Sequence, residues 1–130
     1  MNSRELLDAA DDLITRTDRD TAGLWPRTSA FLIRMALERV IGDIWVLRGV
    51  ALRESSMAAQ LISLPTYTSP ELARRLRATW GALSEACHHH PYELAPTATQ
   101  LRSWLSEVAA AIGDSGTSIT LTSASGSDDD

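Results

Sequence analysis

The chain has 130 residues, of which 44% are hydrophobic and 22% charged, a length and composition that suit one folded domain with its own hydrophobic core. The formal net charge is −5 at pH 7 and all 12 basic residues are arginine, which argues against a strongly basic surface for non-specific nucleic-acid binding. The single cysteine, Cys87, excludes an intramolecular disulfide, and no apolar stretch approaches the roughly 20 residues of a membrane span.

The first predicted helix runs from about Ser3 to Arg16. Asn2 followed by Glu5 has the spacing of a capping box, in which each residue satisfies a free N–H group of the other. An amphipathic stripe follows, made of Leu6, Leu7, Ala10, Leu13 and Ile14. The next segment, TDRDTAGLWP, is typical of a loop, and we expect Trp25 to fold back onto the other helices.

The second predicted helix, from Thr28 or Ser29 to Gly49, is the longest and least polar. Its inner seam consists of Ile33, Leu37, Val40, Ile44, Leu47 and Ala51. A second apolar arc contains Phe31, Met35, Trp45 and Val46, with Gly42 nearby. A helix that is apolar on two arcs either lies at the centre of its own bundle or is covered by another chain. In the second case Phe31, Met35, Gly42 and Trp45 would form a homodimer interface.

Two shorter helices are expected next. The third covers Arg53 to Leu64 and is closed by Pro65, unless it is a kinked continuation of the second. The fourth begins with Ser69 as its cap and Pro70 at the first helical position, and Pro91 ends it near His89 or His90. Its apolar stripe comprises Leu72, Leu76, Thr79, Trp80, Leu83, Ala86, Cys87 and His90.

The last predicted helix begins with a second capping box, formed by Thr97 and Gln100, and ends at Gly113. Its stripe is Leu101, Trp104, Leu105, Val108 and Ile112. Residues 114–130 are small, polar and acidic, which indicates a disordered tail. The sequence therefore predicts an all-α bundle of four to five helices in one domain, residues 1–113, followed by a disordered acidic C-terminal tail, residues 114–130.

The tract Cys87, His88, His89 and His90 is the main candidate for chemistry. Consecutive histidines on a helix point about 100° apart, so they cannot all reach one ion. Cys87 and His90 lie one turn apart and could supply two metal ligands, with the others unidentified. The alternative is structural: Cys87 is a small core residue, His90 lies at a helix end where the dipole favours its charged form, and the other two histidines face solvent. We expect no cofactor.

A compact bundle of four or five helices, with arginines on a helix that ends in histidine, resembles the HEPN superfamily of small bacterial helical domains over residues 28–112. The resemblance implies a dimer and, in catalytic members, an RNA-cleaving site in which an arginine and a histidine on one helix hold a single phosphate. Here the nearest arginine before His88 is Arg77, and the expected positions hold Gly81, Ala82, Leu83 and Ser84. The resemblance thus implies a non-catalytic member, or one that uses Arg74, Arg75 or Arg77 with the histidines across a dimer interface.

Two functions are compatible with these patterns. The first is a non-enzymatic helical protein-interaction module of a bacterial cytoplasmic system, which self-associates, binds a protein partner and does not contact a membrane. The second is a HEPN-like RNA-binding or RNA-cleaving protein, in which His88, His89, His90 and Arg77 are the candidate catalytic residues. Imidazoles titrate near neutral pH and guanidinium groups match phosphate, which supports this alternative.

Overall fold

The computed structural model describes residues 1–16, 25–88 and 94–127, with side chains described as far as residue 113. Within these ranges the chain forms five α-helices and no strand, which confirms the predicted all-α fold. The helices are α1 (Ser3–Thr15), α2 (Trp25–Arg48), α3 (Met57–Tyr67), α4 (Pro70–Cys87) and α5 (Ala98–Ser127). In the described part of the chain, no helix combines the length and apolarity needed to span a membrane.

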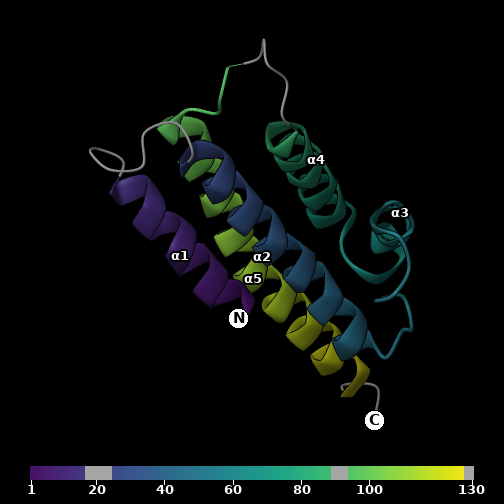
Figure 1. The fold of residues 1–130 in the computed structure, drawn as a ribbon. Helices are drawn as coiled ribbons and strands as arrows, with labels where there is room; N and C mark the ends of the chain where they lie inside the picture. The colour runs from purple at the N-terminus through teal and green to yellow at the C-terminus, as the bar shows by residue number, and fades with distance from the viewer. Residues whose placement is uncertain (17–24, 89–93, 128–130) are drawn as a thin grey trace.

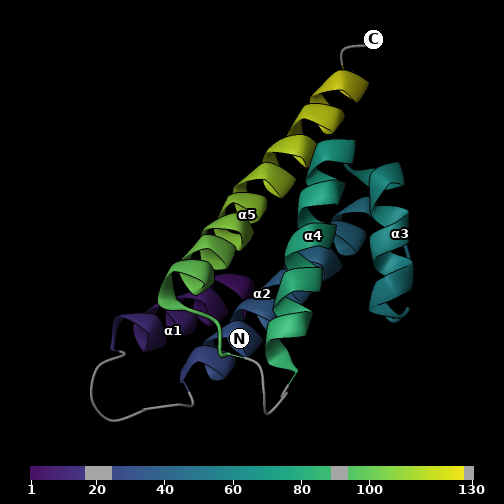
Figure 2. The same ribbon diagram turned by 90° about the horizontal axis from the view of Figure 1, so that it is seen from above.

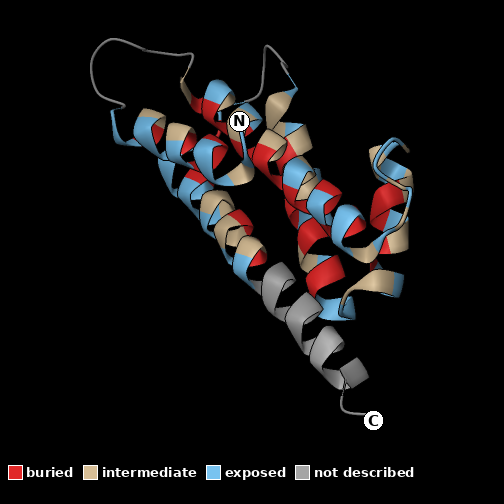
Figure 3. Ribbon diagram, turned by 90° about the horizontal axis from the view of Figure 1, so that it is seen from below, coloured by how far each residue is buried: buried red, intermediate tan, exposed pale blue. Residues whose placement is uncertain are grey.

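Helix α2 is the centre of the bundle. It packs against α1, α4 and α5, and its C-terminal part also touches α3 (Figures 1 and 2). The buried residues face one another between the helices, and the exposed ones lie on the outer sides (Figure 3). From α2 the core takes Ala30, Ile33, Ala36, Leu37, Val40, Ile41, Ile44 and Trp45, all at most 4% exposed. The apolar character of α2 is therefore explained largely by its central place in its own bundle.

Helix α1 is fixed at its start and along its length. The Asn2 side chain accepts a hydrogen bond of 2.8 Å from the Glu5 N–H, and the Glu5 carboxylate accepts one of 3.1 Å from the Asn2 N–H, which confirms the capping box. Farther along, Arg102 of α5 donates to the Asp11 carboxylate at 2.9 Å and to the Thr15 hydroxyl at 3.0 Å. The first and last helices of the bundle therefore lie side by side.

Helix α2 begins and ends differently from its predicted range. It starts at Trp25, because Pro26 sits in the first turn, where its missing N–H leaves no intrahelical bond unmade. At the other end Gly49 adopts φ +67°, and the Gly49 and Val50 N–H groups donate to the carbonyls of Val46 and Trp45. This Schellman motif stops the helix and rules out a continuation into α3. Ala51, expected in the inner seam, therefore lies exposed beyond the helix, and Leu47 of the last turn of α2, expected there too, is 61% exposed.

Helix α3 is shifted toward the C-terminus relative to its predicted range. Ser56 caps it by accepting from the Ala59 N–H at 3.2 Å, so the residues from Arg53 to Ser55 precede it. Pro65 lies inside the last turn rather than closing the helix, at an exposed position where only one backbone bond is lost. The actual end is at Thr68, whose N–H and hydroxyl both donate to the Leu64 carbonyl.

Helix α4 starts as predicted and ends earlier. The Ser69 hydroxyl accepts from the Leu72 N–H at 3.1 Å, and Pro70 occupies the first turn. The helix stops at Cys87, since His88 has an extended backbone with φ −73° and ψ 134°. His89 and His90, where we expected the end, lie outside the described residues.

Helix α5 has the predicted start and a later end. The Thr97 N–H donates to the Gln100 side chain at 3.0 Å and the Gln100 N–H to the Thr97 hydroxyl at 3.1 Å, which confirms the second capping box. Gly113 does not end the helix, which continues to Ser127, because a glycine inside a helix costs only about 1 kcal/mol and does not force a break. The side chains of the predicted tail, and residues 128–130 altogether, lie outside the described part of the structure.

Candidate functional site

The C-terminal end of α4 meets the N-terminal half of α2, and Arg27 connects the two. One guanidinium nitrogen of Arg27, Nη1, donates to the Ala86 carbonyl at 3.1 Å and to the His88 carbonyl at 2.7 Å. The Ala86 carbonyl belongs to the last turn of α4 and the His88 carbonyl to its C-cap, where the helix dipole places partial negative charge. The arginine therefore neutralises this end of α4 and holds it against α2.

About two helical turns further along α2, Arg34 lies against α4. Arg34 Nε is 3.4 Å from the Glu38 carboxylate, and its guanidinium carbon lies 5.8 Å from the ring centroid of Trp80. The same Glu38 oxygen accepts a hydrogen bond of 3.1 Å from the Trp80 indole nitrogen. Glu38 thus holds both an arginine on its own helix and a tryptophan on α4, and the three side chains form a half-buried polar contact between the helices.

Cys87 lies beside this contact and is partly buried. Burial raises the pKa of the Cys87 thiol, while the positive charge and hydrogen bond of Arg34 act in the opposite direction without cancelling the effect. A thiol with a raised pKa remains protonated near neutral pH, and the thiolate is the nucleophilic form. The environment of Cys87 therefore favours its structural interpretation over nucleophilic catalysis.

The predicted catalytic residues are not brought together within one chain. His88 is exposed at the end of α4, whereas Arg77 is exposed on the same helix about 16 Å earlier along the axis, at 1.5 Å per residue. Arg74 is also exposed, and Arg75 is held by Glu107 of α5 at 3.1 Å. His89 and His90 lie outside the described residues.

The arginines that do lie beside the tract come from α2, and the sequence analysis missed them. Arg27 and Arg34 are far from His88 in the sequence, so no local spacing could have indicated the contact. A surface hollow of about 360 Å³ adjoins Arg27, and its lining consists of Arg27, Ala82, Glu85, Ala86, Leu94, Pro96, Gln100 and Trp104. Two of the lining residues are charged, Arg27 and Glu85, and their charges are opposite.

In the part of the chain that the structure describes, no group of three or more histidine, cysteine or acidic side chains could hold a metal ion. The proposed ligand pair of Cys87 and His90 includes a residue outside that part. The pair therefore stays a prediction.

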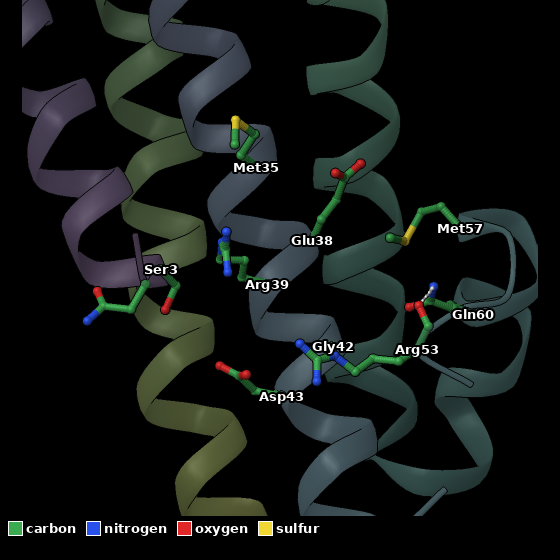
Figure 4. A pocket seen from close by; sticks show the side chains of 10 residues that line it. Ser3, Met35, Glu38, Arg39, Gly42, Asp43, Arg53, Met57 and Gln60 are labelled. Carbon is green, nitrogen blue, oxygen red and sulfur yellow. Dashed lines mark hydrogen bonds between the residues drawn. The ribbon is translucent and has the colours of Figure 1, made fainter. Parts of the chain in front are cut away.

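The second candidate surface is the outward face of α2, which we call the α2 strip. It consists of Phe31, Met35, Arg39, Asp43 and Val46, residues that follow one another at three- or four-residue steps along the helix. Phe31 is 50% exposed and Val46 57% exposed, and Met35 is half-buried. Figure 4 shows Met35, Arg39 and Asp43 one after another along α2. The strip is thus apolar at both ends and carries two opposite charges in the middle.

A cavity of about 410 Å³ lies along the middle of the α2 strip, between the start of α1 and the α3 side of the bundle. It is lined by Asn2, Ser3, Met35, Glu38, Arg39, Gly42, Asp43, Arg53, Met57 and Gln60 (Figure 4). Gly42 forms part of its floor, and the side chain of Arg53 crosses it, with Cγ and Nε 3.7 Å from where a Cβ of Gly42 would be. Three residues of the α2 strip, Met35, Arg39 and Asp43, therefore line this cavity.

Of the four residues expected at a dimer interface, the structure leaves two at the surface. Phe31 and Met35 belong to the α2 strip, whereas Gly42 is buried beneath Arg53. Trp45 is fully buried, because it points toward α3, where its indole nitrogen donates to Gln60 at 2.9 Å and its ring meets Tyr67 edge-on at 5.5 Å. Trp45 is therefore a core residue of this chain, and placing it on an outer surface was wrong.

Comparison of the chain with protein-family models, with curated proteins and with solved structures finds no match.

Proposed function

We propose that this protein is a non-enzymatic helical protein-interaction module of a bacterial cytoplasmic system, and that it works as a homodimer formed through the α2 strip. The observation that carries the proposal is the exposure of Phe31 and Val46 on the central helix of an otherwise well-packed bundle. Phe31 and Val46 lie at opposite ends of the α2 strip, with Met35, Arg39 and Asp43 between them, so one helix laid along the strip contacts both. Covering that face with a second copy removes them from water.

The arrangement of the reactive side chains also supports a non-enzymatic role. Arg27 and Arg34 already bind groups of the chain itself, and burial raises the pKa of the Cys87 thiol. Arg77 and His88 are too far apart along α4 to hold one phosphate group within a chain. The described residues thus supply a framework for association more readily than a set of acid, base and phosphate-binding groups.

Sedimentation velocity over a range of protein concentrations tests the proposal. The wild-type chain is expected to sediment as a dimer, and Phe31→Glu and Val46→Glu are each expected to shift it to a monomer, because a charge would be buried in the contact. Arg77→Glu, at an exposed site on α4, is the matched control and should leave the dimer intact. A wild-type chain that stays monomeric at all concentrations contradicts the proposal.

A second candidate is a HEPN-like RNA-binding or RNA-cleaving protein of a defence or toxin–antitoxin system. The observation that favours it is the position of Arg27 and Arg34 at the end of α4, next to Cys87 and His88. RNA binding and cleavage by the wild type should then both fall when His88, His89 and His90 are replaced together by alanine. Arg77→Ala tests whether Arg77 takes part in this site. Loss of RNA binding or cleavage would mean that Arg77 of one chain acts with the histidines of another chain, and unchanged activity would exclude Arg77 from the site.

A further inference from the structure

The middle of the α2 strip carries two charges that no described residue of the chain pairs. Arg39 and Asp43 are both exposed and lie one turn apart on the outward face of α2. Among the described residues no ion pair joins them, although Arg34 and Glu38, at the same spacing on the same helix, are 3.4 Å apart. Both charges therefore remain available to another molecule.

We propose that this other molecule is a second copy of the chain, bound with its α2 antiparallel to the first, so that Arg39 of each copy pairs with Asp43 of the other. The inference rests on the proposed function, because it specifies the geometry of the same homodimer. A closed dimer has two-fold symmetry, so each contact between unlike residues occurs twice. One arginine and one aspartate per copy are thus sufficient for two ion pairs.

The register follows from the positions of the two charges along the helix. Arg39 and Asp43 lie about 3 Å before and about 3 Å after the level of Ile41, at a rise of 1.5 Å per residue. A two-fold axis at that level brings Arg39 of one copy level with Asp43 of the other. The two side chains differ in direction by only about 40° around the helix, so both can face the same side of the contact.

The same register places the apolar ends of the strip against each other. Met35 lies about 9 Å before the two-fold level and Val46 about 7.5 Å after it, so Met35 of one copy packs beside Val46 of the other. Phe31 then reaches the region around Gly49 and Val50 at the end of the opposite helix. A parallel arrangement with the helices level would instead set Arg39 against Arg39 and Asp43 against Asp43, and like charges across a contact are unfavourable. The charges select the antiparallel orientation.

Charge-swap variants test this geometry. We expect Arg39→Asp and Asp43→Arg each to weaken dimerisation at least tenfold, because each places like charges at both symmetric contacts. The double variant Arg39→Asp with Asp43→Arg restores both pairs with reversed sign, so its dissociation constant should return to within threefold of the wild type. Mixing the two single variants should also produce a heterodimer, since one copy then carries two acids and the other two arginines.

Analytical ultracentrifugation measures the dissociation constants, and native mass spectrometry detects the heterodimer. Circular dichroism checks that each variant is folded, which the exposure of both residues leads us to expect. Arg74→Asp on α4 is the control for a change of net charge at an exposed site. A dimer that is unaffected by both single variants, or weakened by them without rescue in the double variant, overturns the register but leaves self-association standing. A monomeric wild type overturns self-association as well.

Discussion

The indole nitrogen of Trp45 donates a hydrogen bond of 2.9 Å to the side-chain oxygen of Gln60, and both side chains are buried. The Gln60 amide nitrogen in turn donates to the carbonyls of Arg53 and Ser55, at 3.3 and 2.8 Å. One glutamine therefore satisfies a buried tryptophan of α2 and two backbone groups of the connection to α3. The pair fixes where α3 sits relative to the rest of the bundle.

Removing either member of this pair is expected to destabilise the fold. Gln60→Leu leaves the Trp45 N–H and two carbonyls without partners and should lower the free energy of unfolding by about 2–4 kcal/mol. Trp45→Phe leaves the glutamine oxygen without its donor and should cost about 1–3 kcal/mol. Urea unfolding of both single variants and the double variant gives the interaction energy between Trp45 and Gln60, which we expect to be about 1 kcal/mol. Strictly additive effects would contradict an energetic role for the hydrogen bond.

The packing of the C-terminal half of α4 can be tested with Leu83, which belongs to it, and Leu94, which follows it, because their exposures are opposite. Leu83 is fully buried, so Leu83→Ala should lower the free energy of unfolding by about 2–5 kcal/mol through lost burial and the cavity left behind. Leu94 is 97% exposed, and the same substitution there should change stability by less than about 0.5 kcal/mol. Chemical denaturation measures both. Equal effects at the two positions would mean that Leu83 does not pack as described.

The N-terminal cap of α4 offers a test of local structure. Ser69→Ala removes the hydroxyl that accepts from the Leu72 N–H and should destabilise the protein by about 1 kcal/mol. Ser69→Gly should cost only a few tenths of a kcal/mol, because glycine is itself tolerated at this position. Ser106→Ala, at an exposed position within α5, is the control and is expected to be close to neutral. Thermal unfolding of the three variants ranks them, and a neutral Ser69→Ala would exclude the cap as a source of stability.

The reactivity of Cys87 should depend on pH in a defined direction. Burial raises the pKa of its thiol, so the folded protein holds the thiol proton more tightly than the unfolded chain does. Alkylation by iodoacetamide should therefore be slower at pH 8 than for an unstructured peptide of the same local sequence, and its midpoint should lie at higher pH. By the same linkage, any stability from this group is present below the unfolded thiol pKa and is lost as the pH rises through the folded pKa. Alkylation faster than the peptide at pH 7 would indicate a thiolate and revive the nucleophilic hypothesis.

The sequence predicted best those features that are determined within one helical turn. The Asn2–Glu5 and Thr97–Gln100 capping boxes and the Ser69 cap join residues three positions apart, and all are present in the structure. The apolar stripes of α1, α4 and α5 likewise indicated most of the residues that these three helices bury. Local chemistry was sufficient there because the partners are sequence neighbours.

Features that depend on contact with another helix could not be predicted from the local sequence. Trp45 looked like part of an outer arc because its partner, Gln60, comes from α3, and the direction of α3 was not predictable from either segment. The end of α4 depends on Arg27, which binds the Ala86 and His88 carbonyls from a helix far away in the sequence. For the same reason the sequence pointed to arginines on α4, whereas those beside the histidine tract lie on α2.

The contact between Arg102 and Asp11 has a consequence for synthesis on the ribosome. Helix α1 leaves the exit tunnel first, yet part of its apolar side is covered by α5, which is translated after the other four helices. Until Leu101 and Val108 emerge, the nascent chain exposes apolar surface on α1 and α2 that a holding chaperone can recognise. The five-helix bundle therefore cannot close until α5 has been translated and docks.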